Sequence, residues 1–173
     1  MTGRIPVTDP APYPPIQVCG PNIRYAQKIS KGLGCAKSEL SAFTTYEYQH
    51  WILTACQPGL ADTISRIARV EMHHLDILGK LVADLGGDPK YVCDQNGCCV
   101  CWNSGMLCYS QDLRTILSNN IADEKKAAEF YKETARDIAD PLISNILSRL
   151  ELDEMLHACI FTRYLQELCG GCV

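Results

Sequence analysis

The chain has 173 residues, a formal net charge of -4 and 47% hydrophobic residues. This length supports one domain with a sizeable core, and a mildly acidic chain without a basic cluster is not expected to bind nucleic acid. No run is long and apolar enough to span a membrane, and the Pro-rich start lacks the apolar core of a signal peptide. We therefore expect a cytoplasmic protein with no membrane partner.

The chain begins with two short features before its longer segments. Residues 1–20 are rich in proline, which predicts an extended N-terminal arm. Asn22 can cap a short helix that runs to about Lys31, where Gly32 and Gly34 end it. Residues 21–168 then form the predicted domain, and residues 169–173 form a Cys-Gly-Gly-Cys tail.

Four longer segments carry apolar residues at helical spacing, at about 36–56, 62–85, 111–139 and 141–168. Pro58-Gly59 and Asp140-Pro141 predict tight turns, with Asp62 placed to cap the second helix. Residues 88–109 form a long, Cys-rich connection between the second and third helices. We expect an all-α four-helix bundle with one long crossover.

One pattern occurs twice along the chain. Each copy has a Glu, a Tyr seven residues later, and a Glu-x-x-His that begins 32 or 30 residues after the first Glu. The copies are Glu39, Tyr46, Glu71 and His74, followed by Glu124, Tyr131, Glu154 and His157. A duplicated helix pair is the simplest interpretation.

The four repeated acids lie in the middle of otherwise apolar helix stripes. Burial would remove their hydration and push their pKa values upward. Lys and Arg are missing from these four stripes, so bound metal cations are the simplest way to offset the free-energy cost of burying the acids. The repeat therefore predicts four carboxylates and two imidazoles as ligands for two metal ions.

Two other acids compete for these roles. Glu47 points about 80° away from Glu39 on the helical wheel, and its counterpart in the second copy is Lys132. Glu129 lies about 140° from Glu124 and should face solvent. The repeat thus selects Glu39 and Glu124 as ligands.

Three further polar residues are assigned no ligand role. His73 lies about 100° round the helix from His74 and is expected at an edge. His50 is interpreted as a core histidine whose hydrogen bonds are satisfied. Asp153 is expected to lie off the buried face.

These motifs resemble the ferritin-like di-metal carboxylate superfamily, in particular the rubrerythrins and manganese-catalase-like spore-coat proteins. The resemblance covers residues 21–168 and implies a ferritin-like bundle. It implies bridging by Glu71 and Glu154, with Glu39 and His74 completing one ion's ligands and Glu124 and His157 the other's. Tyr46 and Tyr131 would contact the ligands, although a plain core role for them is about equally consistent. The implied cofactor is two Fe or two Mn ions per chain.

The sequence also departs from these relatives. Rubrerythrins carry a further carboxylate at the position of Ala127 and a C-terminal rubredoxin module, whereas this chain ends in Cys169-Gly-Gly-Cys172. Manganese catalases typically lack the carboxylate that Glu154 supplies. Iron and manganese are both left open as the metal.

The function that the resemblance implies is an oxidoreductase that reduces or dismutates hydrogen peroxide. The alternatives are a ferroxidase or iron-storage protein, and a structural spore-coat or encapsulated cargo protein that retains a metal site. The expected partners are a small oxidant (peroxide or dioxygen), an electron-donor protein, and further copies of the chain in a dimer or larger homo-oligomer.

Eleven cysteines are the second notable feature. Cys98-x-x-Cys101 and Cys169-x-x-Cys172 could form one four-thiolate site for Zn or Fe, within a chain or between subunits. Scattered free thiols or a crosslinking set are an equally good interpretation. Cys19, Cys35, Cys56 and Cys159 are expected to be single and buried or inert.

Overall fold

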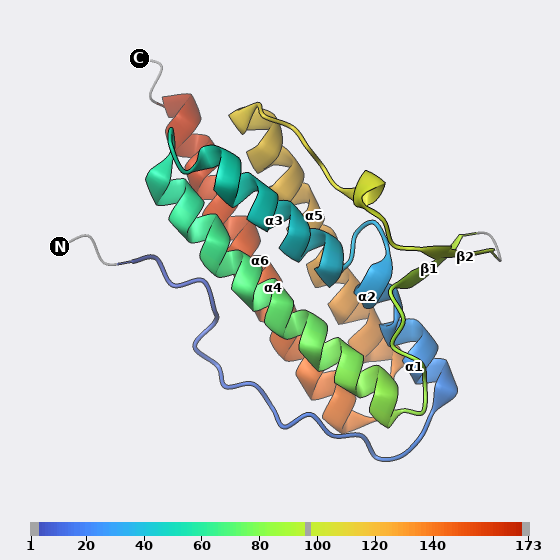
Figure 1. The fold of residues 1–173 in the computed structure, drawn as a ribbon. Coiled ribbons are helices and arrows are strands. Elements are labelled where there is room, and N and C mark those ends of the chain that lie inside the picture. Colours follow the sequence, from blue (N-terminus) through green and yellow to red (C-terminus); the bar gives the residue numbers. More distant parts are fainter. Residues whose placement is uncertain (1–3, 96–97, 171–173) are drawn as a thin grey trace.

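Four long helices form a bundle in the computed structural model, which describes residues 4–95 and 98–170. These helices are α3 (Glu39–Leu53), α4 (Pro58–Asp84), α5 (Leu113–Asp137) and α6 (Pro141–Gly170). Helix α3 packs beside α4 and α5 beside α6, and one long crossover joins the two pairs (Figure 1). The predicted all-α fold class is confirmed.

The helix ends follow the local sequence, with one difference. Gly86 adopts φ +82°, a left-handed conformation that favours glycine, directly after α4. Asp112 caps α5 by accepting a 2.8 Å hydrogen bond from the backbone N–H of Thr115. Helix α4 begins at Pro58, four residues before Asp62, so Asp62 does not cap it but instead accepts from Arg66 at 3.0 Å.

Two short helices precede the bundle where the sequence predicts one. Helix α1 (Ile23–Ile29) is capped by the Asn22 side chain as expected, and α2 (Lys31–Gly34) follows at once. Gly34 is needed for packing, because a Cβ there would come within 2.4 Å of the Tyr91 backbone. The two glycines therefore do not end the first helix but allow α2 to pack closely.

The crossover contains a small hairpin tied to the start of α3. Strands β1 (Val92–Gln95) and β2 (Cys98–Cys101) pair antiparallel, and a short 3₁₀ helix, η1 (Ser104–Met106), follows. Cys93 forms a disulfide with Cys35, so the expectation that Cys35 is single is wrong. The indole N–H of Trp102 also donates a 2.9 Å hydrogen bond to the Ser41 hydroxyl on α3.

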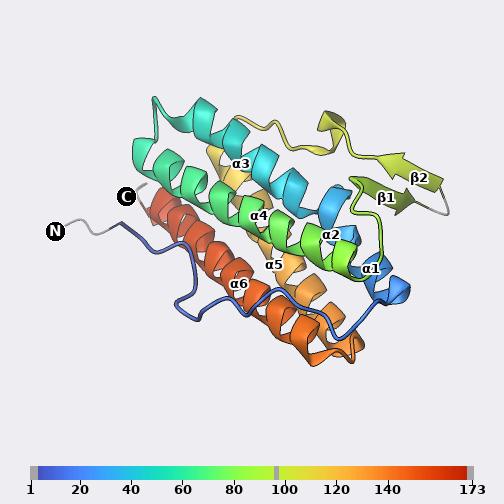
Figure 2. The same ribbon diagram turned by 60° about the horizontal axis from the view of Figure 1, so that its bottom comes forward.

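The N-terminal arm follows the length of the bundle along α4 and α6 (Figures 1 and 2). Its backbone is held by arginines, since Arg66 donates to the Ile5 carbonyl at 2.6 Å and Arg149 to the Ala11 carbonyl at 2.6 Å. Near its end, the Cys19 N–H donates to Asp140 at 2.7 Å. The extended segment is thus packed against the bundle.

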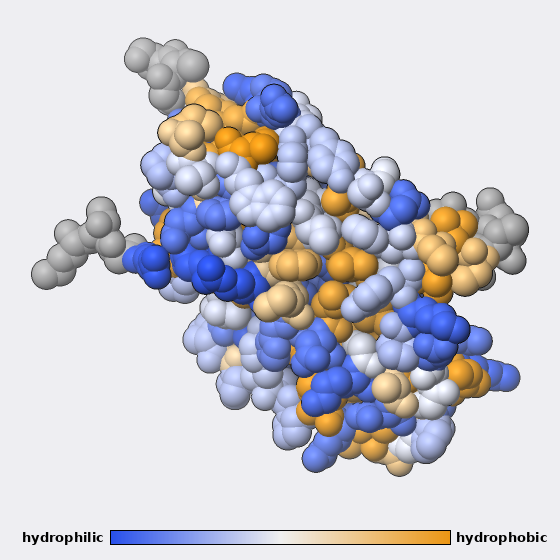
Figure 3. Space-filling view, viewed as in Figure 1, coloured by the Kyte–Doolittle hydropathy of each residue, from blue (hydrophilic) through white to orange (hydrophobic). Residues whose placement is uncertain are grey.

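The core consists of two apolar clusters. One includes Leu33, Leu78 and Leu147, and the other includes Ile64, Leu117 and Phe161. On the surface, hydrophobic residues gather near the middle of one face and over the hairpin, amid hydrophilic surroundings (Figure 3). Within the described part of the chain, no helix is long and apolar enough to cross a membrane.

Candidate metal centre

The bundle interior brings all six predicted ligand residues together. They form two groups of four that share two members: Glu39, Glu71, His74 and Glu154, and Glu71, Glu124, Glu154 and His157. In each group one candidate ligand atom per residue lies within 4.8 Å of all the others, and every member is buried. Each long helix supplies at least one of these residues, which explains why the motif is spread over the whole chain.

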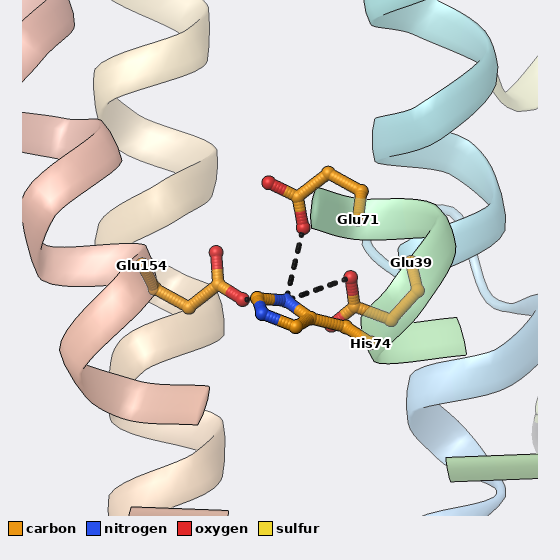
Figure 4. Close-up of side chains that lie close together, drawn as sticks. All are labelled: Glu39, Glu71, His74 and Glu154. Carbon is orange, nitrogen blue, oxygen red and sulfur yellow. Dashed lines mark ion pairs between the residues drawn. The ribbon is translucent and has the colours of Figure 1, made fainter. Parts of the chain in front are cut away.

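The first group is arranged around Nδ1 of His74 (Figure 4). This atom lies 2.9 Å from Oε1 of Glu154, 3.3 Å from Oε2 of Glu71 and 3.7 Å from Oε2 of Glu39. Three carboxylates from three helices therefore converge on one imidazole nitrogen.

The second group repeats this arrangement around Nδ1 of His157. The atom lies 2.8 Å from Oε1 of Glu71, 3.6 Å from Oε2 of Glu154 and 3.7 Å from Oε1 of Glu124. Glu71 and Glu154 thus turn one oxygen toward each histidine. This is the arrangement of two carboxylates that bridge a pair of metal ions.

The unpaired polar atoms of the site fit bound cations. Within the described residues, both oxygens of Glu71, both oxygens of Glu154 and Nδ1 of both histidines are buried without a hydrogen-bond partner. Buried polar atoms without partners are costly, and metal ions would satisfy all six at once. The structure therefore has a buried carboxylate/His di-metal site.

Glu39 and Glu124, the outer acids, each belong to only one of the two groups, and both have raised pKa values. For the side chains alone, burial and then the charge of Glu154 raise the pKa of Glu39 well above its ordinary value. Burial and then the charge of Glu71 raise the pKa of Glu124 in the same way. A bound metal would therefore compete with protons for these two carboxyl groups more strongly than at an exposed carboxyl.

The two shared acids, Glu71 and Glu154, have lowered pKa values instead. Burial disfavours ionisation of Glu71, but the positive charges of His157 and His74 outweigh it and hold its pKa below the usual value. Burial and Glu71 act likewise on Glu154, and the two histidines again lower the pKa overall. Burial opposes protonation of the histidines, yet the surrounding carboxylates raise both of their pKa values. The expectation of four raised carboxyl pKa values is therefore wrong for Glu71 and Glu154.

Two tyrosines hold the outer acids from across the bundle. Tyr46 on α3 donates to Oε1 of Glu124 at 2.5 Å, and Tyr131 on α5 donates to Oε1 of Glu39. Both rings are buried. Each tyrosine thus contacts the ligand of the other repeat copy.

The groups that contact Nε2 of each histidine, on the side away from the clustered acids, were not predicted from the sequence. Asp153 is fully buried, contrary to expectation, and its Oδ2 accepts from Nε2 of His74 at 3.1 Å. The N-terminal arm buries Asp153, and Arg149 pairs with it at 2.8 Å. The spacing of four residues between Arg149 and Asp153 is a sequence signal for such a pair. The Val7 carbonyl, which accepts from Nε2 of His157 at 2.9 Å, is a backbone group and leaves no signal.

A pocket of about 210 Å³ leads to the acids between α3 and α5. The crossover residues Met106, Leu107 and Cys108 form part of its lining. The Ser38 hydroxyl also lines it and is buried without a hydrogen-bond partner among the described residues. At the inner end of the pocket lie four carboxylates, those of Glu39, Glu71, Glu124 and Glu154. A small molecule can therefore approach the site from this side.

The rival residues lie outside both ligand groups. Glu129 is exposed and lies 3.7 Å from Lys132, while Glu47 is partly buried on α3. His50 is partly buried, and its Nδ1 lies 3.0 Å from the Ala61 carbonyl oxygen, as expected for a satisfied histidine. His73 is exposed and packs edge-on against Tyr13.

The predicted four-thiolate site receives no support within one chain. Cys101 belongs to the hairpin and Cys169 to the end of α6, and these elements lie far apart in both views of the fold (Figures 1 and 2). The Cys98 side chain and Cys172 lie outside the described residues, and no cysteine joins a metal-ligating group in the described part. Cys19, Cys56 and Cys159 are single, as expected, but they are exposed and not buried, and their inertness stays a prediction. A site between subunits stays a prediction.

Comparisons with known proteins agree with this geometry. KatB, a manganese catalase from Anabaena, has 26% sequence identity and a TM-score of 0.81, covering 92% of this chain and 79% of that one. A bacterioferritin from Desulfovibrio desulfuricans, at 20% identity and a TM-score of 0.71, covers 85% of this chain and 81% of its own, and shows the fold alone. The search of curated proteins found no match. The family model named Rubrerythrin matches residues 35–165, which is most of the chain and includes all six clustered residues, so this protein belongs to the rubrerythrin family.

Proposed function

We propose that this protein is a di-metal oxidoreductase that consumes hydrogen peroxide. The observation that carries the proposal is the shared position of Glu71 and Glu154, each of which turns one oxygen toward each histidine. The similarity to a manganese catalase supports peroxide as the substrate and favours manganese. Iron with an external reductant is the alternative, because the same Glu/His set accepts both metals.

The residues divide into two roles. Glu71 and Glu154 would bridge the ions, Glu39 and His74 would complete one position, and Glu124 and His157 would complete the other. Two Mn or Fe ions held in this way supply a two-electron redox couple for peroxide. The protein contributes fixed ligand geometry, because the ligands come from four packed helices and the tyrosines orient the outer acids.

The pocket between α3 and α5 would admit the substrate. Its volume of about 210 Å³ suits a molecule of the size of peroxide accompanied by water. The Ser38 hydroxyl has no hydrogen-bond partner in the part of the chain that the structure describes, and the buried amides of Asn120 and Gln49 bond each other at 2.8 and 2.9 Å. These groups give the interior a polar character. The apolar clusters on either side limit access of bulk water.

The test is to load the protein anaerobically with Mn(II) or Fe(II) and add hydrogen peroxide. Disproportionation converts two peroxide molecules into two water molecules and one O₂, so an oxygen electrode detects it. Reduction consumes one peroxide, two electrons and two protons to give two water molecules, and proceeds only with an added reductant. The double variant Glu71→Gln/Glu154→Gln should be inactive, whereas the exposed-site control Glu129→Gln should retain activity.

Two results would contradict the proposal. One is the absence of peroxide consumption by either metal-loaded form, with or without reductant. The other is uptake of iron far beyond two ions per chain into a large hollow oligomer, which would indicate storage instead.

A further inference from the structure

The N-terminal arm closes the side of the metal centre that faces away from the pocket. It lies along α4 and α6, whereas the pocket lies between α3 and α5 (Figures 1 and 2). Arg149 on α6 holds it in place with hydrogen bonds of 2.6 Å to the Ala11 carbonyl and 2.9 Å to the Asp9 carbonyl. The Arg149 guanidinium also stacks over the Tyr13 ring, 4.1 Å from its centroid.

The arm contacts or supplies the group that lies against Nε2 of each histidine. These two hydrogen-bond partners differ in charge. Nε2 of His74 lies 3.1 Å from Asp153, a carboxylate that also accepts from the Asp9 N–H at 2.7 Å and from the Tyr13 hydroxyl, and that forms an ion pair with Arg149 at 2.8 Å. These contacts hold the carboxylate in place beside His74. Nε2 of His157 instead donates to a neutral backbone carbonyl, that of Val7, at 2.9 Å.

These contacts determine how each imidazole meets its metal. Because both Nε2 atoms are engaged on the arm side, both Nδ1 atoms point toward the carboxylate groups. A histidine that donates to a carboxylate is a stronger electron donor to a metal than one that donates to a neutral carbonyl. The internal repeat makes the direct ligands alike, whereas Asp153 on α6 and the Val7 carbonyl of the arm make their surroundings different.

We propose that the different hydrogen-bond partners of the two histidines, which the N-terminal arm completes, make the two metal positions unequal. The position of Glu39 and His74 binds a divalent ion more tightly than the position of Glu124 and His157. In this inference, which rests on the proposed di-metal centre, Asp153 and Tyr13 are positioning residues that act through His74. The protein would then carry one firmly held ion and one exchangeable ion.

The test is an anaerobic titration of the metal-free, full-length protein with Mn(II), with free Mn(II) followed by its EPR signal. Wild type should show two binding steps whose dissociation constants differ by about tenfold or more, the usual size of such outer effects on metal affinity. Glu39→Gln should remove the tight step and Glu124→Gln the weak one, which assigns the steps to the two positions.

Asp153→Asn then tests the cause, because it keeps the shape of the side chain and removes its charge. It should weaken the tight step about tenfold and leave the weak step unchanged, so that the two steps merge. Tyr13→Phe should shift the tight step in the same direction by less. The matched control is Tyr25→Phe, since the Tyr25 hydroxyl accepts from the Ala139 N–H, away from the metal centre.

Each outcome decides between the inference and its rivals. Two equal binding steps in wild type, or equal weakening of both steps in Asp153→Asn and in Tyr13→Phe, would overturn the inference while leaving the di-metal centre intact. A variant with a purely structural defect would lose thermal stability without changing the ratio of the two dissociation constants. If Asp153→Asn does not fold, Tyr13→Phe carries the test. Failure of wild type to bind any Mn(II) or Fe(II) would instead overturn the di-metal proposal itself.

Discussion

The Tyr46 hydroxyl on α3 donates a 2.5 Å hydrogen bond to Glu124 on α5. The equivalent tyrosine of the second repeat copy, Tyr131, donates to Glu39 on α3. The two copies therefore exchange tyrosines, so that each copy orients the outer acid of the other. A shift of the Glu39 or Glu124 carboxylate would therefore disturb a contact between the two helix pairs.

The first prediction concerns these hydroxyl groups. Tyr46→Phe removes the donor to Glu124 and should weaken metal binding at that position about tenfold, because the carboxylate loses the contact that orients it. Isothermal titration with Mn(II) measures the change. Tyr48→Phe is the control, since the Tyr48 hydroxyl donates to the exposed Tyr109 carbonyl at 3.4 Å and belongs to neither ligand group. Equal affinities for wild type and Tyr46→Phe would show that the tyrosine is a packing residue only.

A second prediction tests the access route. Ala127 lines the pocket on α5, so Ala127→Leu should narrow it and slow peroxide consumption at least about tenfold, or about 1.4 kcal/mol of added barrier. Metal content should not change, because Ala127 belongs to neither ligand group. Ala122→Leu, at an exposed position on the same helix, should leave the rate unchanged. An undiminished rate in Ala127→Leu would place substrate access elsewhere.

The third prediction concerns pH. Without metal, the raised pKa values of Glu39 and Glu124 favour the protonated form in the folded state, so stability falls as pH rises above their unfolded value of about 4.5. The raised histidine pKa values add to this loss above about pH 6.5. The lowered pKa values of Glu71 and Glu154 act oppositely and remove stability only below about pH 4.5.

Metal binding reverses the dependence near neutral pH, because it requires deprotonated ligands. The difference in melting temperature between the metal-loaded and chelated protein should therefore grow from pH 5 to pH 8. Calorimetric scans at fixed ionic strength measure this difference. A difference that shrinks with rising pH would be incompatible with ligands that lose protons on binding.

The fourth prediction concerns the disulfide. Cys35 and Cys93 are 58 residues apart, and a crosslink over such a loop stabilises a protein by about 2–4 kcal/mol. Cys35→Ser should lower the free energy of unfolding by this amount in urea titrations without reductant. Cys159→Ser removes an exposed free thiol and should have little effect. Identical unfolding curves for Cys35→Ser and wild type would show that the crosslink does not form in solution.

The sequence was sufficient to predict the bundle and the grouping of the six site residues, because both depend on local periodicity. Glu39, Glu71 and Glu124 lie within apolar stripes whose period fixes the face of the helix. The repeat then excluded Glu47, whose counterpart is a lysine. Once the buried face of each helix is known, packing of the four helices is enough to predict that these residues lie together.

What the sequence did not reveal depends on contacts between distant segments. The helical spacing places Asp153 outside the predicted buried face, but the N-terminal arm covers it. The Val7 contact uses a backbone carbonyl, which any residue could supply. Pairing of Cys35 with Cys93 depends on the path of the crossover, and eleven cysteines allow many pairings. The lowered pKa of Glu71 arises because two histidines approach it at once, a detail of geometry.

Metal stoichiometry is the most direct test of the central claim that the six clustered residues form one di-metal centre. Elemental analysis after anaerobic loading and removal of loosely bound ions should give two Mn or two Fe per wild-type chain. Glu39→Ala and Glu124→Ala should each lose metal, whereas Glu47→Ala and Glu129→Ala should keep both ions. A wild-type chain that holds one ion or none, or a Glu47→Ala variant that empties the site while Glu39→Ala does not, would contradict the account.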